Sequence, residues 1–349
     1  MIGYYVHHQG TGHLHRAAAV AEAWTRTMAE EVVGLSSLPR PAAWRGRWFV
    51  LERDDASLRP DDPTAGEQLH WVPLGEEGLR HRMAAMSHWM GREAPRALVV
   101  DVSVEVLMLA RLHGVPTVAV VLPGRRTDAA HLTAFRAACA LVAAWPEGDG
   151  VEPTMTPDLP PDVTARLHSV GAISRFGPGL AAAARVGAGA DRRVALLQGA
   201  GGGAICDLVE ADLATRTPGW RWTVLGPGHN WVVDPTPVLR AADVVVCTAG
   251  QGALADVAAL RRPAVVLPLP RPYDEQACTA RALSRGRWPA VVVDTPEQAL
   301  DSAVLDRAAR LDGARWQAWC DGQGARRFAE VIGAVALPRR GPSEPAVPA

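Results

Sequence analysis

The segment from Val244 to Val257 restricts the possible folds more than any other part of the chain. It reads VVVCTAGQGALADV, which is a run of apolar residues, a short turn containing Gly250 and Gly252, and then a helix. An apolar run of this kind is typical of a buried strand in a parallel sheet. A strand end that leads into a helix N-terminus is also a frequent phosphate site. The segment therefore predicts an α/β fold and a candidate anion-binding turn.

A second buried strand follows about twenty residues later and ends in a polar loop. Residues 265–276 read VVLPLPRPYDEQ, so a proline-stiffened loop carries Asp274, Glu275 and Gln276. Carboxylates and amides of this kind can hydrogen-bond sugar hydroxyls. Because the carboxyl ends of parallel strands share one edge of a sheet, the triplet and the preceding turn are expected to lie near each other.

Strand and helix patterns alternate through both halves of the chain, and a length of 349 residues favours two domains. Doubly wound sheets are the expected architecture. The expected divisions are an N-terminal domain over 1–175, a linker over 176–190, a C-terminal domain over 191–324, a final helix over 325–337 and a disordered, proline-rich tail over 338–349.

Composition excludes several classes of function. The net charge of -1 argues against a general nucleic-acid binder. All 36 basic residues are Arg, which excludes a lysine nucleophile, a Schiff base and a P-loop lysine. The five Cys form no CxxC pair and no metal-binding spacing with His, so reduced thiols in a cytoplasmic protein and no metal are expected. The first residues have the pattern of a strand, so no signal peptide is expected, and the apolar runs are too short to span a membrane.

The first half offers His13 and Asp101 as candidate catalytic residues. His13 ends the turn HHQGTGH over residues 7–13, between a strand and an Ala-rich helix. Asp101 directly follows the strand at 97–100, so both residues are expected at the ligand-binding edge of one sheet. A carboxylate there can hold an imidazole in one tautomer. The alternatives remain that Asp101 only caps a helix, and that His13 is structural and the turn glycines Gly10 and Gly12 only make a tight turn.

The second half begins with another glycine-rich turn. The strand at 193–197 leads into QGAGGGA at 198–204, followed by a helix. Glycines at such a turn let backbone N–H groups approach an anion closely, and the helix N-terminus adds positive potential. A flexible loop without a ligand is the alternative.

Taken together, the motifs of the second half resemble a known enzyme family. They are QGAG at 198–201, ADVV at 242–245, TAG at 248–250, LAD at 254–256, VVLP at 265–268 and DEQ at 274–276. This pattern is similar to the C-terminal, nucleotide-sugar-binding domain of family 28 glycosyltransferases over most of residues 191–300. In the first half, GTGH at 10–13 resembles the short Gly-His turn of the same enzymes.

The resemblance implies a GT-B fold, in which two Rossmann-like domains face a cleft and the last helix crosses back to the first domain. It implies inverting, metal-independent transfer of a sugar, expected to be an N-acetylhexosamine, from a UDP-sugar without a cofactor. Asp256 stands where the family has a Glu that binds the ribose. Gln276 matches a Gln that contacts the sugar, Glu275 replaces a second Gln, and Asp274 has no counterpart.

The remaining expected donor contacts also follow from the resemblance. The turns expected at the diphosphate contribute Gly12, Gly199, Ala200, Gly201, Thr248, Gly250, Gln251 and Gly252. Trp231 and Val233 lie where the uracil-contacting segment of the family falls. In this scheme His13 would take the proton of the acceptor hydroxyl, and Asp101 would orient it.

Other functions of the same fold stay open at this point. GTGHLHR at 10–16 is also similar to the turn of the UDP-sugar hydrolase of nonulosonate synthesis, in which His13 would activate water. A UDP-sugar epimerase and a non-catalytic nucleotide-sugar sensor are further alternatives. The acceptor is unknown. It is either a small molecule or lipid-linked, with peripheral membrane contact through the loops near 40–48 and 123–131.

Overall fold

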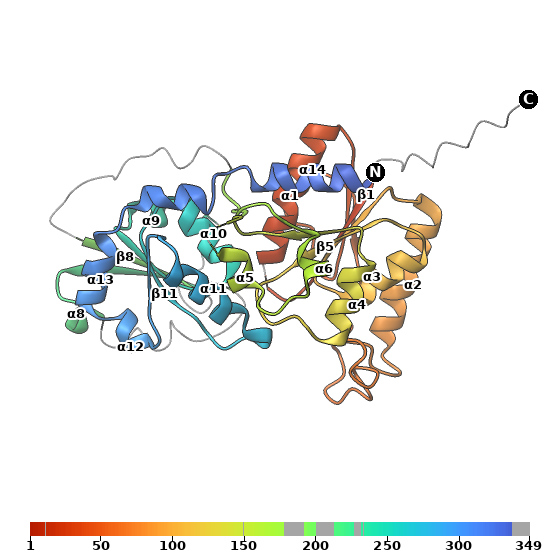
Figure 1. The fold of residues 1–349 in the computed structure, drawn as a ribbon, viewed down its shortest axis with the longest axis horizontal. Helices are drawn as coiled ribbons and strands as arrows, with labels where there is room; N and C mark the ends of the chain where they lie inside the picture. Colours follow the sequence, from red (N-terminus) through yellow and green to blue (C-terminus); the bar gives the residue numbers. More distant parts are fainter. Residues whose placement is uncertain are drawn as a thin grey trace, which may run out of the picture.

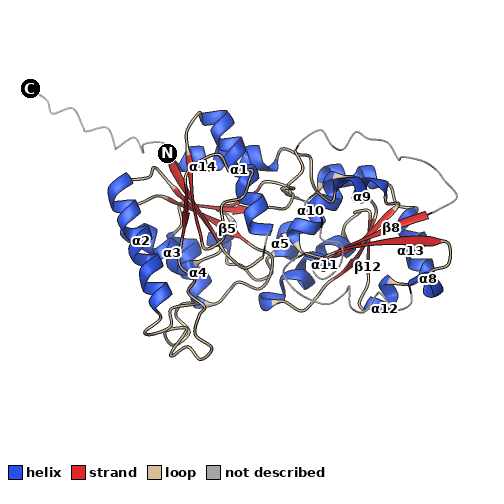
Figure 2. Ribbon diagram, turned by 180° about the vertical axis from the view of Figure 1, so that it is seen from behind, coloured by secondary structure: helices blue, strands red, loops and turns tan. Residues whose placement is uncertain are grey.

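The described strands form two separate parallel sheets (Figures 1 and 2). The computed structural model describes residues 1–10, 12–148, 150–177, 192–199, 213–226, 232 and 234–336. Within these residues the first sheet has the strand order β3-β2-β1-β4-β5-β6-β7. Its strands are β1 (Ile2–Val6), β2 (Val32–Ser36), β3 (Trp48–Val50), β4 (Leu98–Asp101), β5 (Thr117–Val121), β6 (Ala140–Ala143) and β7 (Leu167–Ser169).

The second sheet has the order β12-β11-β10-β8-β9 in the part of the chain that the structure describes. Its strands are β8 (Arg192–Leu197), β9 (Trp220–Leu225), β10 (Val244–Thr248), β11 (Ala264–Leu267) and β12 (Ala290–Val292). The central strands β10 and β11 are buried at every residue, because helices cover both faces of the sheet. The predicted α/β class with two doubly wound sheets is confirmed.

Helices connect the strands in both domains. Those of the first domain are α1 (Gly12–Met28), α2 (Glu77–Glu93), α3 (Val104–Leu112), α4 (Ala129–Ala137), α5 (Val151–Met155) and α6 (Pro161–Thr164). Those after β8 are α8 (Leu213–Arg216), α9 (Thr236–Ala241), α10 (Gln251–Ala259), η2 (Pro272–Asp274), α11 (Glu275–Arg285), α12 (Pro296–Ala299), α13 (Ser302–Ala309), η3 (Gly313–Ala318) and α14 (Gly324–Ala336).

Each sheet reverses its strand order at one point. The first sheet reverses between β1 and β4, and the second between β8 and β10. Ligands of open α/β sheets bind at such a reversal, in the crevice outside the carboxyl ends of the strands. The loops that leave these four strands are therefore the places where a site is expected.

The last helix, α14, packs on the first domain beside α1 (Figure 1). Its buried residues recur at helical spacing, with Phe328 and Ile332 fully covered, which gives one apolar stripe. The stripe faces Trp24 of α1, and the ring of Phe328 lies 6.4 Å from that of Tyr4. The chain therefore returns from the second domain to the first, where α14 packs against the helix that carries His13.

The expected linker and tail fall mostly on residues outside this description. Only Phe176 and Gly177 of the linker are described, and the tail over 338–349 lies wholly outside. The domain boundaries that depend on them stay predictions.

Truncating Phe328 tests the contribution of α14 to the first domain. We expect Phe328→Ala to lower the free energy of unfolding by about 3–5 kcal/mol, because a fully buried ring leaves a cavity. Glu330→Ala, on the exposed side of the same helix, should change it by less than about 1 kcal/mol. Urea unfolding followed by circular dichroism measures both, and equal losses in the two variants would contradict this packing.

Candidate active site

His13 and Asp101 lie together where the first sheet reverses its strand order. His13 is in the first turn of α1, and Asp101 is the last residue of β4. The Nδ1 atom of His13 lies 2.8 Å from Oδ1 of Asp101. The carboxylate is fully buried, whereas the side chain of His13 keeps 19% of its exposure. The structure thus brings the two candidates together, with the imidazole above the buried acid.

Arg16, one turn after His13 on α1, is the third member of this group. Its Nε lies 3.1 Å from Oδ2 of Asp101 and its Nη2 lies 2.7 Å from Oδ1. Burial alone would raise the pKa of Asp101, but the charge of Arg16 and the contact with His13 hold that pKa well below its ordinary value. The carboxylate is therefore ionised and can only accept hydrogen bonds.

The ionised carboxylate fixes the tautomer of His13. Nη2 of Arg16 also lies 3.0 Å from Nδ1 of His13, and both nitrogens converge on Oδ1 of Asp101. Because that oxygen accepts from both, we assign a proton to Nδ1 of His13. Nε2 then keeps its lone pair, as a general base requires.

Arg16 also reaches the second domain. Its Nη1 donates to Oε1 of Gln251 at 3.2 Å, and Gln251 is the first residue of α10. The two helices meet so closely that a Cβ on Gly252 would lie 3.5 Å from the Cα of Gly12. The glycines at the starts of α1 and α10 therefore allow these two helix N-termini, one from each domain, to lie close together.

A cavity of about 410 Å³ lies between the two reversals. It is bounded by loops that follow β1, β8, β10 and β11. The predicted site residues that line it are Gly12, His13, Gly199, Thr248, Gly250, Gln251, Gly252, Glu275 and Gln276.

The N-terminus of α10 is open toward this cavity. Gly250 is its N-cap residue, no side chain caps it, and its first turn contains no acidic residue. Unpaired N–H groups and the helix dipole give such an end a positive potential. Arg271 lines the same cavity. This wall is suited to an anion such as a diphosphate.

The loop after β11 supplies polar groups to the other side of the cavity. Gln276 is buried, and its Oε1 accepts from the backbone N–H of Leu269 at 2.9 Å. That bond fixes the amide, and Nε2 lies toward Gly250. Glu275 lies 3.7 Å from Arg126 of the first domain, so this loop also joins the domains.

Asp256, the expected ribose contact, is held by partners within the protein, and the ribose contact itself stays a prediction. It is only 2% exposed and does not line the cavity. Its Oδ1 accepts from the hydroxyl of Ser174 at 2.7 Å, and its Oδ2 pairs with Arg175 at 2.6 Å. A buried carboxylate needs such partners, because an unpaired buried charge is costly. Asp256 therefore fixes the position of the segment at Ser174 and Arg175, where the chain leaves the first domain.

Asp274 also lies outside the cavity. It is exposed, has a left-handed backbone with φ 57°, and its carboxylate lies 3.5 Å from Arg125. The backbone turn directs it to the first domain instead of the donor side. Ala200, Gly201, Trp231 and Val233 lie outside the described residues.

Sequence reasoning missed Arg16, Arg271 and Tyr273. Arg16 could have been found, because it lies three residues after His13 and so shares its face of the helix. Tyr273 lines a second cavity beside His13 from the opposite domain, and nothing local in the sequence indicates that placement.

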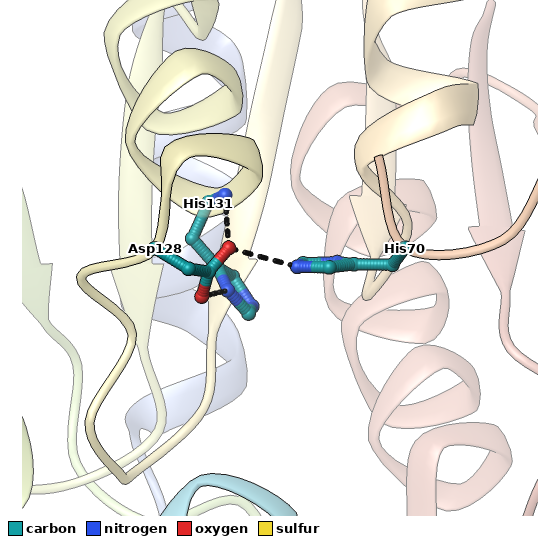
Figure 3. A group of neighbouring side chains, drawn as sticks. All are labelled: His70, Asp128 and His131. Atoms are coloured by element: carbon teal, nitrogen blue, oxygen red, sulfur yellow. Dashed lines mark hydrogen bonds and ion pairs between the residues drawn. The ribbon is translucent and has the colours of Figure 1, made fainter. Parts of the chain in front are cut away.

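Two groups of His and acidic residues also assemble in the described part of the chain, and Figure 3 shows the one formed by His70, Asp128 and His131. His70 reaches from its loop to Asp128 at 3.0 Å, and His131 lies 2.6 Å from the same carboxylate. Arg126 lies 3.1 Å from the other ring nitrogen of His131 and opposes a further cation. In the second group, of His8, Asp54 and Asp55, arginines pair with both acids. The expectation of no metal stays a prediction.

Among the described helices, none combines the length and the apolar character that a membrane span requires.

Comparisons with known proteins agree with this arrangement. Residues 232–305 match the glycosyltransferase family 28 C-terminal domain. No curated protein sequence is significantly similar to the chain. Among solved structures, MurG of Acinetobacter baumannii is 14% identical, with a TM-score of 0.60, and the match covers 95% of this chain and 99% of that one.

Two further solved glycosyltransferases have a similar fold. The glycosyltransferase of kitacinnamycin is 17% identical, with a TM-score of 0.66 and coverage of 97% and 99%. The spinosyn rhamnosyltransferase SpnG, complexed with thymidine diphosphate, is 16% identical, with a TM-score of 0.54 and coverage of 96% of both chains. The predicted GT-B architecture is therefore confirmed. Residues 232–305 are thus similar to a glycosyltransferase family 28 C-terminal domain, and the chain as a whole has the GT-B fold of these solved glycosyltransferases.

Proposed function

We propose that the chain transfers a sugar from a UDP-sugar to a hydroxyl group of an acceptor, with inversion and without a metal. The observation that carries the proposal is the meeting of two sites at one cavity. His13 on its buried carboxylate borders the cavity from the first domain, and the uncapped start of α10 borders it from the second.

In this proposal each domain serves one part of the reaction: the second stabilises the leaving group, and the first takes the proton of the acceptor. The N-terminus of α10 and Arg271 would stabilise the diphosphate as the bond from its oxygen to the anomeric carbon breaks. Nε2 of His13 would take the proton of the acceptor hydroxyl as its oxygen forms the new bond to that carbon. Asp101 would stabilise the imidazolium that results. Glu275 and Gln276, at the end of β11, are proposed to contact the sugar.

The identity of the nucleotide is the least determined part of the donor. The resemblance to family 28 favours uracil, whereas a solved structure of the same fold was obtained with thymidine diphosphate. The N-acetylhexosamine is proposed from the same resemblance. A hydrolase would use the same His13 with water in place of the acceptor, and a sensor would bind the donor without turnover.

A thermal-shift panel tests the donor. We expect UDP-sugars at about one hundred times Kd to stabilise the protein by about 3 kcal/mol, and GDP-sugars to leave it unchanged. Stabilisation by TDP-sugars alone would replace uracil by thymine in the proposal. No response to any nucleotide sugar would contradict donor binding altogether.

Replacing His13 tests the chemistry. We expect His13→Ala to lower the rate of UDP release by about 10²–10⁴-fold, with donor affinity kept, because the general base is lost. His168→Ala, an exposed histidine on β7, is the matched control and should keep its activity. Product analysis then distinguishes the classes. A glycoside supports transfer, free sugar supports hydrolysis, and no product in the native chain supports a sensor.

Replacing Asp101 tests the ion pair beneath His13. We expect Asp101→Asn to lower the free energy of unfolding by about 3–5 kcal/mol at pH 7, because Arg16 stays buried without its partner. The native pKa of Asp101 is depressed, so the stability it contributes is present above its unfolded value of about 4 and is lost as the pH falls below it. The gap between native and variant stability should therefore narrow from pH 5 to pH 2 in unfolding experiments. A gap that stays constant over this range would contradict the assignment of charge.

A further inference from the structure

A second cavity, of about 290 Å³, is lined mostly by the first domain, with Tyr273 contributed by the second. Gln9 and Leu122 line both this cavity and the one against α10, so the two cavities adjoin. His7 lines the second cavity, and its ring lies 6.1 Å from that of His13. A molecule seated here can therefore present a hydroxyl group to His13 from the side opposite the diphosphate wall.

Rings dominate the walls of this cavity. Eight of its lining residues carry a ring, four of them aromatic and four of them imidazole. One wall is a continuous set of rings. His131 lies 4.3 Å from His70, 4.9 Å from Tyr273 and 5.5 Å from Phe135, measured between ring centroids. Figure 3 shows how Asp128 holds the two imidazoles of this wall. Ring faces and edges of this kind favour a planar aromatic partner.

Tyr273 comes from the second domain and is held in place by the first. Its backbone O accepts from the N–H of Arg125 at 2.8 Å, and a Cβ on Gly124 would lie only 2.3 Å from that oxygen. The guanidinium of Arg126 lies 4.9 Å from the centre of its ring. Tyr273 and Asp274 both have left-handed backbones, which is costly away from glycine and is typical of functional loops. Tyr273 is still 38% exposed, so its ring is available to a ligand.

The charges around the cavity largely cancel. Asp54, Asp55 and Glu105 face the guanidiniums of Arg82 and Arg126 in the lining, and Arg53 pairs with Asp55 from outside it.

Both guanidiniums are already engaged. Arg82 lies 2.5 Å from Asp54, and Arg126 donates to the backbone O of Leu122 at 3.0 Å. Burial lowers the pKa of His7 to about 3 and that of His131 to about 4, so both rings are neutral near pH 7. A lipid diphosphate would therefore meet a lining whose two guanidiniums are already engaged by protein groups.

We propose that this cavity binds the acceptor, and that the acceptor is an uncharged, planar aromatic compound with a hydroxyl group. The volume is close to the lower limit of about 300 Å³ for ligand pockets, which fits a small fused ring system. Tyr273 completes the pocket only when the two domains are together. The inference rests on the proposed function, because it assigns the acceptor of the same reaction.

Direct binding of matched probes to the full chain tests the acceptor class. The probes are 2-naphthol, 2-decalol and farnesyl diphosphate. Calorimetric titration at pH 6.5 measures the affinity of the chain for each of them. The first two share one carbon skeleton and differ in aromaticity. We expect 2-naphthol to bind about tenfold more tightly than 2-decalol, and farnesyl diphosphate not to displace it. Equal affinity for the two alcohols, displacement by farnesyl diphosphate, or no binding of 2-naphthol would overturn the proposal.

Variants of Tyr273 place the probe in this cavity. We expect Tyr273→Ala to weaken 2-naphthol binding about three- to tenfold and Tyr273→Phe to keep it within about twofold, because the ring makes the contact. Phe49→Ala, at an exposed ring on β3, should bind like the native chain. An unchanged affinity in Tyr273→Ala would overturn the assignment.

The acceptor class and the proposed function fail in different ways. Binding of 2-naphthol through Tyr273 with no product from any nucleotide sugar would contradict glycosyl transfer and support the acceptor class. Release of UDP by a chain that does not bind 2-naphthol would support turnover and overturn the acceptor class.

Discussion

The buried ion pair of Arg16 and Asp101 is the interaction on which the site depends. Asp101 is fully buried and Arg16 nearly so, and neither charge would be tolerated there without the other. The pair leaves one carboxylate oxygen shared with His13, which fixes the imidazole. The same guanidinium contacts Gln251 at the start of α10. One buried cation thus connects His13 of the first domain to the N-terminus of α10 in the second.

Other contacts of the fold hold these groups of the two domains in position. In each sheet the strand order reverses next to the cleft, and α14 packs against α1. On the other side of the cleft, the loop before α11 contacts the first domain through Tyr273 and Glu275. The cavities proposed for donor and acceptor therefore adjoin at Gln9 and Leu122, and each is lined by residues from both domains. A reaction between two substrates benefits from this arrangement, because closure orients both and excludes water.

The sequence predicted the features that arise from local patterns. Buried strands, glycine turns and the placement of His13 and Asp101 at strand ends follow from periodicity and the geometry of parallel sheets. The partners of buried charges could not be predicted, because they depend on contacts between residues far apart in the chain. Asp256 illustrates this limit. Its position in the motif suggested a ribose contact, yet its carboxylate is bound by Ser174 and Arg175 about eighty residues away. Tyr273 is a similar case, since only the docking of two domains places its ring beside His131.

A crystal structure of the chain with a bound UDP-sugar would show whether the cavity between the two strand-order reversals holds the nucleotide sugar against His13. We expect the diphosphate at the N-terminus of α10, within hydrogen-bond distance of the N–H groups of Gln251 and Gly252, and the anomeric carbon on the side of His13. A nucleotide sugar bound elsewhere, or one with its anomeric carbon turned away from His13, would contradict the account.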